Sequence, residues 1–198
     1  MAGRLVLVAS LVAALAAPAF AAEYTFDPNH TQAEFSVVHL GFSHVEGFIP
    51  VTSGTLTFGE EALPLSVSAT LNAAALDTKS ADRDNDLRGP DWFDTAKYPT
   101  MSFVSTRIEG KGPGDFTILG NLTMHGVTKP VTLAAKFEGK MVDARGRSHV
   151  AYTATTTIDR RDFGLNFGKT VPGGALVAGF DISIRLSVEA IAAGGHPT

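Results

Sequence analysis

The 198-residue sequence predicts an all-β, antiparallel fold with one short helical flap. Apolar and polar residues alternate with a period of two over most of the chain, as in strands that bury one face. Turn signals rich in Gly, Pro, Asn and Asp separate roughly eight or nine such segments, and the short connections favour antiparallel neighbours. A closed β-barrel of about eight strands would remove the exposed edges of this sheet, while a two-sheet sandwich fits the same pattern.

The alternation places the expected strands one after another along the chain. In the segment 65–72, Leu65, Val67, Ala69 and Leu71 form an apolar face, and serine and threonine occupy most of the opposite face. The same pattern predicts strands over residues 35–39, 51–58, 65–72, 100–109, 115–124, 130–140, 150–158 and 180–188.

The helical flap interrupts the strands between residues 72 and 100. Ser80 is placed to cap the first turn, Asp82 and Asp84 suit the positive end of the helix dipole, and Gly89 followed by Pro90 ends the helix. A connection of this length inside a compact β domain is usually functional or disordered, and the aromatic residues that follow the helix argue against disorder.

Two aromatic segments are expected to flank the mouth of the fold. Trp92 and Phe93 follow the flap helix, and Phe163, Leu165 and Phe167 alternate in a glycine-rich loop before the last strand. We expect these segments to form opposite lips of one opening. The alternative is that Phe163 and Phe167 fill the interior of a small barrel.

The N-terminal segment predicts secretion. Arg4 precedes an apolar run of about 13 residues, too short to span a bilayer, and Ala19 and Ala21 fit an A-x-A cleavage site. Residues 1–21 are therefore expected to be a signal peptide, residues 22–198 a single domain, and the mature chain to lack an integral membrane segment. The chain has no cysteine, so its stability outside the cytoplasm must come from its core.

Charge and composition narrow the classes of partner. The formal net charge is −4 and the basic residues are scattered, so no nucleic-acid partner is expected, because phosphate binding depends on clustered cations. The chain is 44% hydrophobic and only 18% charged, which is apolar for a soluble protein of this size. This surplus of apolar side chains needs an interior to occupy.

The residues give little support for catalysis or for a metal. His30, His39 and His44 are nine and five residues apart across turns, and His125 lies in another turn, so none has the spacing of a strand or helix metal site. The chain also lacks a G-x-S-x-G elbow and a phosphate loop. We expect a protein that is not an enzyme and that holds no metal and no cofactor.

Four segments together resemble one protein family. They are "DPNHTQAEFSVVHLGFSHVEGF" from Asp27, "LRGPDWFDTAKYPTMSFVS" from Leu87, "GNLTMHGVTKPV" from Gly120 and "IDRRDFGL" from Ile158. In this order they are similar to the motifs of the YceI-like, polyisoprenoid-binding periplasmic proteins. The resemblance implies a lipocalin-like antiparallel barrel in the periplasm with an isoprenoid or other long-chain lipid inside, such as a quinone, a polyprenol or a fatty amide.

On this reading, inward side chains line the site of the lipid tail and aromatic side chains close its mouth. An error of one residue in strand register would exchange every inward residue for its neighbour. An exposed apolar mouth would also let two copies pair as a homodimer. The expected ligand-binding residues are Phe35, Val37, Phe103, Phe116, Ile118, Phe180 and Ile182 along the tail, and Trp92, Phe93, Phe163 and Leu165 at the mouth.

Two other functions remain as alternatives at this point. A barrel filled by its own side chains would act as a stress-response or interaction module. An enzyme acting on an isoprenoid quinone would depend on polar residues such as His39 or Asp162. The nearly apolar inward faces favour the lipid carrier over both.

Overall fold

The computed structural model describes residues 21–58, 63–110 and 114–193, which fold into one antiparallel sheet with a few short helical segments. The strands are β1 (Ala22–Phe26), β2 (Gln32–His39), β3 (Ser43–Ile49), β4 (Val51–Phe58), β5 (Pro64–Asn72), β6 (Thr100–Glu109), β7 (Asp115–Met124), β8 (Val127–Val142), β9 (Ser148–Asp159) and β10 (Ala178–Ala192). The helical segments are η1 (Ala73–Ala75), α1 (Ala81–Arg88) and η2 (Arg160–Phe163).

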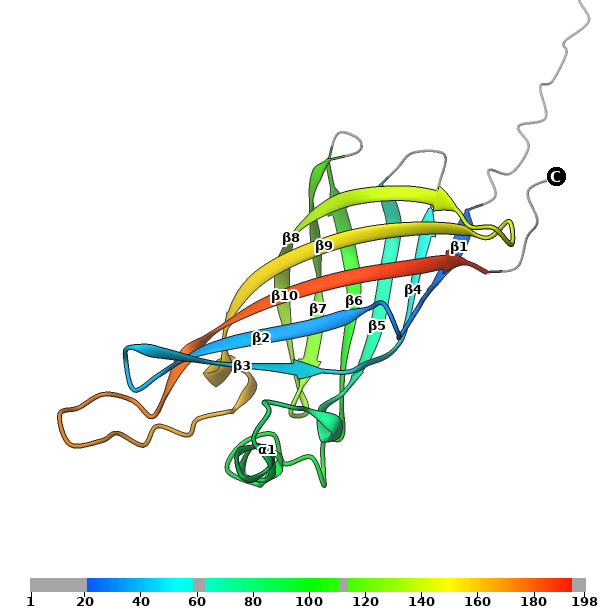
Figure 1. Ribbon diagram of the computed structural model, residues 1–198. Coiled ribbons are helices and arrows are strands. Elements are labelled where there is room, and N and C mark those ends of the chain that lie inside the picture. Colours follow the sequence, from blue (N-terminus) through cyan, green and yellow to red (C-terminus); the bar gives the residue numbers. More distant parts are fainter. Residues whose placement is uncertain (1–20, 59–62, 111–113, 194–198) are drawn as a thin grey trace, which may run out of the picture.

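Eight of these strands close into a barrel (Figure 1). The strand order β1-β4-β5-β6-β7-β8-β9-β10 returns to its start because Tyr24, Thr25 and Phe26 of β1 pair with the C-terminal end of β10. The N-terminal part of β10 pairs with β2 instead, so the β2–β3 hairpin continues the sheet beyond the seam. The predicted all-β barrel is confirmed, and the alternative of a two-sheet sandwich is wrong.

A buried threonine joins β1 to β2 along the edge of β10. The Thr31 hydroxyl donates to the Glu189 carbonyl at 3.1 Å and accepts from the Glu189 amide at 3.3 Å, and the Asp27 amide also donates to the Glu189 carbonyl. Thr31 therefore satisfies the backbone of β10 at the point where neither strand reaches it. Its side chain is buried within this joint.

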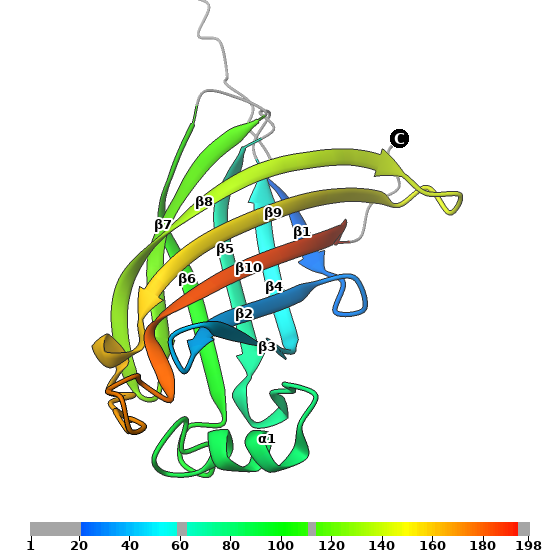
Figure 2. The same ribbon diagram turned by 60° about the vertical axis from the view of Figure 1, so that its left-hand side comes forward.

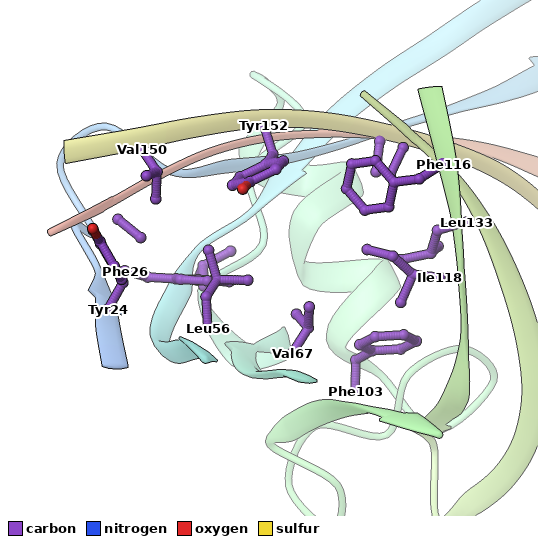
Figure 3. Packing of buried hydrophobic residues seen from close by; sticks show 14 of the residues in the cluster. Tyr24, Phe26, Leu56, Val67, Phe103, Phe116, Ile118, Leu133, Val150 and Tyr152 are labelled. Atoms are coloured by element: carbon purple, nitrogen blue, oxygen red, sulfur yellow. The ribbon is translucent and has the colours of Figure 1, made fainter. Parts of the chain in front are cut away.

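The barrel interior contains two packed regions. The larger one includes an aromatic group at the barrel end away from α1, where Tyr152 packs on Phe58, Phe116 and Phe137 with ring centroids 5.2–5.9 Å apart. The smaller one lies at the end near α1 and contains the fully buried Leu76. Within the larger region, inward side chains of opposite walls face one another (Figure 3).

The apolar face predicted for the strand over residues 65–72, which is β5 in the structure, is wrong at one position. Leu65 is 62% exposed, whereas Pro64 and Val67 are buried. The pairing of β4 with β5 shifts by one residue between Thr57 and Phe58, and this bulge breaks the alternation before Val67. From Val67 onward the inward face follows the prediction.

The predicted flap helix is confirmed as α1, which lies across one end of the barrel (Figure 2). Ser80 occupies the N-cap position, but its side chain makes no capping hydrogen bond, so this part of the prediction is wrong. The buried Asp84 carboxylate instead accepts from the amide and the hydroxyl of Thr78 at 2.8 and 2.6 Å, which lowers the pKa of Asp84. The helix is thus fixed to the chain that precedes it.

Two further sets of hydrogen bonds hold the flap, one to the barrel and one within the connection between β5 and β6. Asp77 and Phe48 of β3 exchange two backbone hydrogen bonds, at 2.8 and 3.0 Å. The Arg88 guanidinium donates to the carbonyls of Ala74 and Leu76, at 2.8 and 2.7 Å. The flap is therefore joined to β3 as well as to β5 and β6, and Arg88 fixes its helix to the residues that follow β5.

The predicted signal peptide lies, except for its last residue, outside the described residues. Among residues 21–58, 63–110 and 114–193, no helix has the length and the apolar character needed to cross a membrane.

A histidine between two carboxylates ties the β8–β9 turn to β10. The Nδ1 atom of His149 lies 2.8 Å from Glu189 Oε1, and its Nε2 atom lies 3.2 Å from Asp143 Oδ2. The side chain of His149 is 13% exposed. The hydrogen bond to Glu189 and then that to Asp143 raise the pKa of His149 above its ordinary value of 6.5.

We therefore expect part of the stability to depend on protonated His149. A raised folded-state pKa adds stability that is fully present below the unfolded pKa, near 6.5, and is lost as pH rises through the folded pKa. Urea unfolding of wild type and His149→Gln should show a larger difference in unfolding free energy at about pH 5.5 than at about pH 9. His44→Gln, at an exposed position of β3, is the control. A difference for His149→Gln that stays constant with pH would contradict this assignment.

Candidate functional site

The barrel encloses a cavity of about 480 Å³, within the size range of small-molecule sites. Its wall consists mainly of inward apolar side chains of β2 and β5 to β10, and it extends from the aromatic group around Tyr152 to the flap. Phe103 and Ile118 face this space from β6 and β7 (Figure 3). The interior is thus not filled by the side chains of the barrel.

The structure brings most of the predicted site residues together around this cavity. The lining includes Phe35, Val37, Trp92, Phe93, Phe103, Phe116, Ile118, Leu165 and Ile182. Their contact with a ligand stays a prediction. Two predicted residues, Phe163 and Phe180, lie outside the lining.

Phe163 and Phe180 are excluded for different reasons. Phe163 is 1% exposed and packs in the smaller core region, below the loop that follows η2. Phe180 lies in an irregular part of β10, because Ala178 pairs with His39 and Ile182 with Val37, which leaves three residues of β10 opposite the single Val38 of β2. This bulge removes Phe180 from the inward face that Ile182 occupies.

The mouth of the cavity lies where the flap meets the loop between η2 and β10. Trp92 of the flap packs on Phe167 of this loop, with ring centroids 4.6 Å apart. The predicted opposition of two aromatic lips therefore holds, but Phe167 contacts Trp92 while Phe163 lies below. The alternative that Phe167 fills the barrel is not met, since Phe167 lines the cavity at its mouth.

Arg160 is a mouth residue that the sequence analysis did not single out. Its guanidinium lies over the rings of Trp92 and Phe180, at 5.1 and 4.8 Å from their centroids, and the residue is 2% exposed. Burial lowers the pKa of Arg160, and the charge of Asp159 partly offsets this effect. The guanidinium remains a cation, because its ordinary pKa is far above neutral.

Backbone carbonyls are the hydrogen-bond acceptors around Arg160. Its Nε atom donates to Gly179 at 2.9 Å, its Nη1 atom to Leu165, and its Nη2 atom to Phe167 and Ala178 at 2.6 and 3.0 Å. One side chain thus fixes both ends of the loop that forms one lip. The signal in the sequence was Arg160 itself, the first arginine of the segment "IDRRDFGL" that resembles the family motif.

Further charged groups cluster on the flap side of the mouth. Arg83 and Asp86 of α1 contribute to the lining, and Arg83 also donates to the hydroxyl and carbonyl of Thr78. Glu34 of β2 is the other charged residue of the lining. The cavity therefore combines a long apolar interior with a polar rim at the end covered by α1.

The histidines do not come together. His39 lines the cavity and donates from Nδ1 to the Val177 carbonyl at 2.6 Å, whereas His44 is exposed and His125 bonds to the Phe163 carbonyl at 3.1 Å. In the part of the chain that the structure describes, one group has metal-ligand atoms within 4.8 Å of one another, and it consists of Asp27, His30 and Glu189. Its atoms already form hydrogen bonds with one another and with His149.

We expect replacement of Arg160 to loosen the mouth. The substitution Arg160→Met keeps much of the side-chain volume but leaves four carbonyl acceptors without their donor, so unfolding free energy should fall by about 2–4 kcal/mol. The matched control is Arg161→Met, at an exposed neighbour that pairs with Asp159 and should leave stability close to wild type. Chemical denaturation measures both, and equal effects would contradict a special role of Arg160.

Comparison with known proteins places this chain in a family. The model of the YceI-like domain matches residues 24–190. A UPF0312 protein of Shewanella putrefaciens is 39% identical over 160 residues, which cover 79% of this chain and 82% of that protein.

Solved structures share the architecture. BcnA of Burkholderia cenocepacia superposes with a TM-score of 0.69 at 19% identity, over 83% of this chain and 98% of BcnA. A polyisoprenoid binding domain of Saccharophagus degradans, described as implicated in plant cell wall breakdown, superposes with a TM-score of 0.61 at 15% identity, over 86% of this chain and 98% of that domain. The family match reaches from within β1 to within β10, and the chain belongs to the YceI-like family.

Proposed function

We propose that this protein is a periplasmic carrier that binds a long-chain isoprenoid or a related lipid inside its barrel. The observation that carries the proposal is the 480 Å³ cavity, whose wall is apolar along the interior and polar at the end covered by α1. In this arrangement the tail occupies the interior and the head group lies at the mouth, near Arg83 and Arg160. Secretion through a cleaved signal peptide, residues 1–21, is part of the proposal.

The magnitude of apolar burial favours a lipid over a small polar ligand. Each methylene moved from water into the cavity contributes about 0.8 kcal/mol, so ten buried methylenes offer about 8 kcal/mol before the cost of ordering the ligand. The charged residues of the wall could add selectivity for the head group, but they are too few to hold a polar ligand of this volume. The polyisoprenoid binding domain of Saccharophagus degradans has the same fold, which supports the isoprenoid class.

Catalysis has less support in the geometry. His39 already donates to a backbone carbonyl, and Asp162 is exposed and does not line the cavity. The two polar residues that the enzyme hypothesis invoked are therefore not combined around one reacting centre. We propose binding without turnover.

Adjacent alanines of β8 provide a matched test of the cavity. Ala135 is 4% exposed and lines the cavity, whereas Ala134 is exposed on the outer face. Ala135 pairs across the sheet with Ala154 and Phe116, and the small side chain of Ala154 leaves room for a larger neighbour. We expect Ala135→Phe to fill part of the cavity and to lower the amount of bound lipid at least about tenfold, a loss that two buried methylenes would account for.

The measurement is organic extraction of the purified variants followed by mass spectrometry, together with titration of cis-parinaric acid, a fluorescent fatty acid. Ala134→Phe should retain lipid and probe as wild type does, because its ring points away from the interior. Circular dichroism and thermal unfolding verify that both variants fold. Equal lipid content in the two folded variants, or no lipid and no probe binding in wild type, would contradict the proposal.

A further inference from the structure

Two loops project together from the barrel beside the mouth (Figure 1). One is the β2–β3 turn, residues 39–44, and the other is the segment 166–177 between η2 and β10; together they are called the paired loops below. Leu40 and His39 both contact the Val177 carbonyl, through the Leu40 amide at 3.4 Å and His39 Nδ1 at 2.6 Å. The paired loops therefore form one projecting unit rather than two independent tips.

Each of the paired loops has a defined local structure. In the segment 166–177, Thr170 bridges to Leu176, and the Val171 amide donates to the Ala175 carbonyl at 3.0 Å, as in a small hairpin. In the β2–β3 turn, Leu40 and Gly41 have φ angles of 53° and 81°, and the Phe42 amide donates to the His39 carbonyl at 3.2 Å. A left-handed leucine in such a turn is unfavourable, because glycine or asparagine normally occupies that position.

The tip of the paired loops is apolar and exposed. Phe42 is 80% exposed, the highest value among the large hydrophobic residues exposed in the described chain. Pro172, Gly173 and Gly174 are exposed at the tip of the neighbouring loop. A phenylalanine held in water by a strained turn has no role in the packing of the barrel, which points to a role in contact with something outside it.

The paired loops also lack acidic residues. Residues 39–44 and 166–177 contain no Asp or Glu, in a chain with 20 of them, and Lys169 carries their one formal charge. The nearest acidic residues along the chain, Glu46, Asp162 and Asp181, lie outside these segments. The paired loops therefore present an aromatic ring at their tip and one cation, Lys169, nearer their root beside Val177, the combination that suits the interface of a bilayer with anionic head groups.

The roots of the same loops belong to the cavity. His39, Phe167 and Val177 line it, whereas Phe42 does not. We propose that the paired loops dock on a lipid membrane through Phe42, so that a lipid passes between the bilayer and the mouth without crossing bulk water. This inference rests on the proposed function for the identity of the cargo, but the docking itself is independent of whether the cavity holds lipid.

Docking of this kind is weak and reversible. A single aromatic side chain and its neighbours bury far less apolar surface than a membrane-spanning helix, and the chain has no cluster of cations that would hold it at the surface. A carrier that must leave the membrane with its cargo requires such an affinity. The absence of acidic residues matters because it avoids repulsion by anionic head groups.

The test is co-sedimentation of the mature protein with unilamellar vesicles of phosphatidylethanolamine and phosphatidylglycerol. We expect wild type to partition onto the vesicles. The partition coefficient of Phe42→Ser should be lower by at least about tenfold, because the Phe42 ring, once inserted in the bilayer, is the main contact. Phe42→Trp should retain binding. The matched control is Leu65→Ser, which removes another exposed hydrophobic residue, 62% exposed, at the barrel end away from the flap, and should bind as wild type does.

Titration of cis-parinaric acid without vesicles separates docking from the proposed function. Phe42→Ser should bind this probe as wild type does, because Phe42 does not line the cavity. Failure of wild type to bind the probe, with vesicle binding intact, would count against the lipid-carrier proposal alone. Docking is overturned if wild type stays in the supernatant, or if Phe42→Ser and wild type partition equally. Light scattering measures the oligomeric state of both proteins. Docking is also overturned if wild type is a dimer through Phe42, and if Phe42→Ser loses vesicle binding only because it is a monomer.

Discussion

Closure of the sheet at β10 is the constraint on which the cavity depends. β10 pairs with β9 along one side, while β1 and β2 share its other side end to end. Only three residue pairs join β1 to β10, yet they close β1 and β4 to β10 into a ring, and of the described strands β3 alone keeps an edge beyond β2. Inward side chains of the ring are removed from water on all sides, so an interior volume that they do not fill remains an apolar cavity.

The mouth depends on a different interaction, a buried cation held by backbone carbonyls. A guanidinium is costly to bury, and four carbonyl acceptors together with two aromatic faces offset much of that cost around Arg160. These acceptors belong to both ends of the loop, so the loop and the charge stabilise each other. The flap meets this rigid lip through Trp92 and Phe167.

Much of the architecture could be predicted from the sequence, because side-chain alternation reports burial directly. The strands, the flap helix and most lining residues followed from period two and from turn signals. Leu65 and Phe180 did not, since each lies at a bulge where extra residues interrupt the alternation, and bulges leave no regular mark in a single sequence. Alternation could not decide between a barrel and a sandwich. That decision needed the pairing of β1 with β10, a contact between the two ends of the domain.

The role of Arg160 was hidden for another reason. A charged residue in a sequence suggests a side chain that faces solvent or pairs with an opposite charge. The neighbouring Asp159 pairs with Arg161 and not with Arg160. Carbonyl acceptors are present at every residue, so a pattern of side chains cannot reveal that four of them converge on one guanidinium. The same limit applies to Thr31, whose hydroxyl replaces missing backbone pairing beside Glu189.

The position of Trp92 gives the molecule a built-in optical reporter. It is the single tryptophan of the chain, and it lies between Phe167, Arg160 and the cavity. Its emission therefore arises at the entrance alone, without a background from the rest of the barrel. Wavelength shifts and collisional quenching of this one indole would follow opening and filling of the entrance in real time, with no label attached.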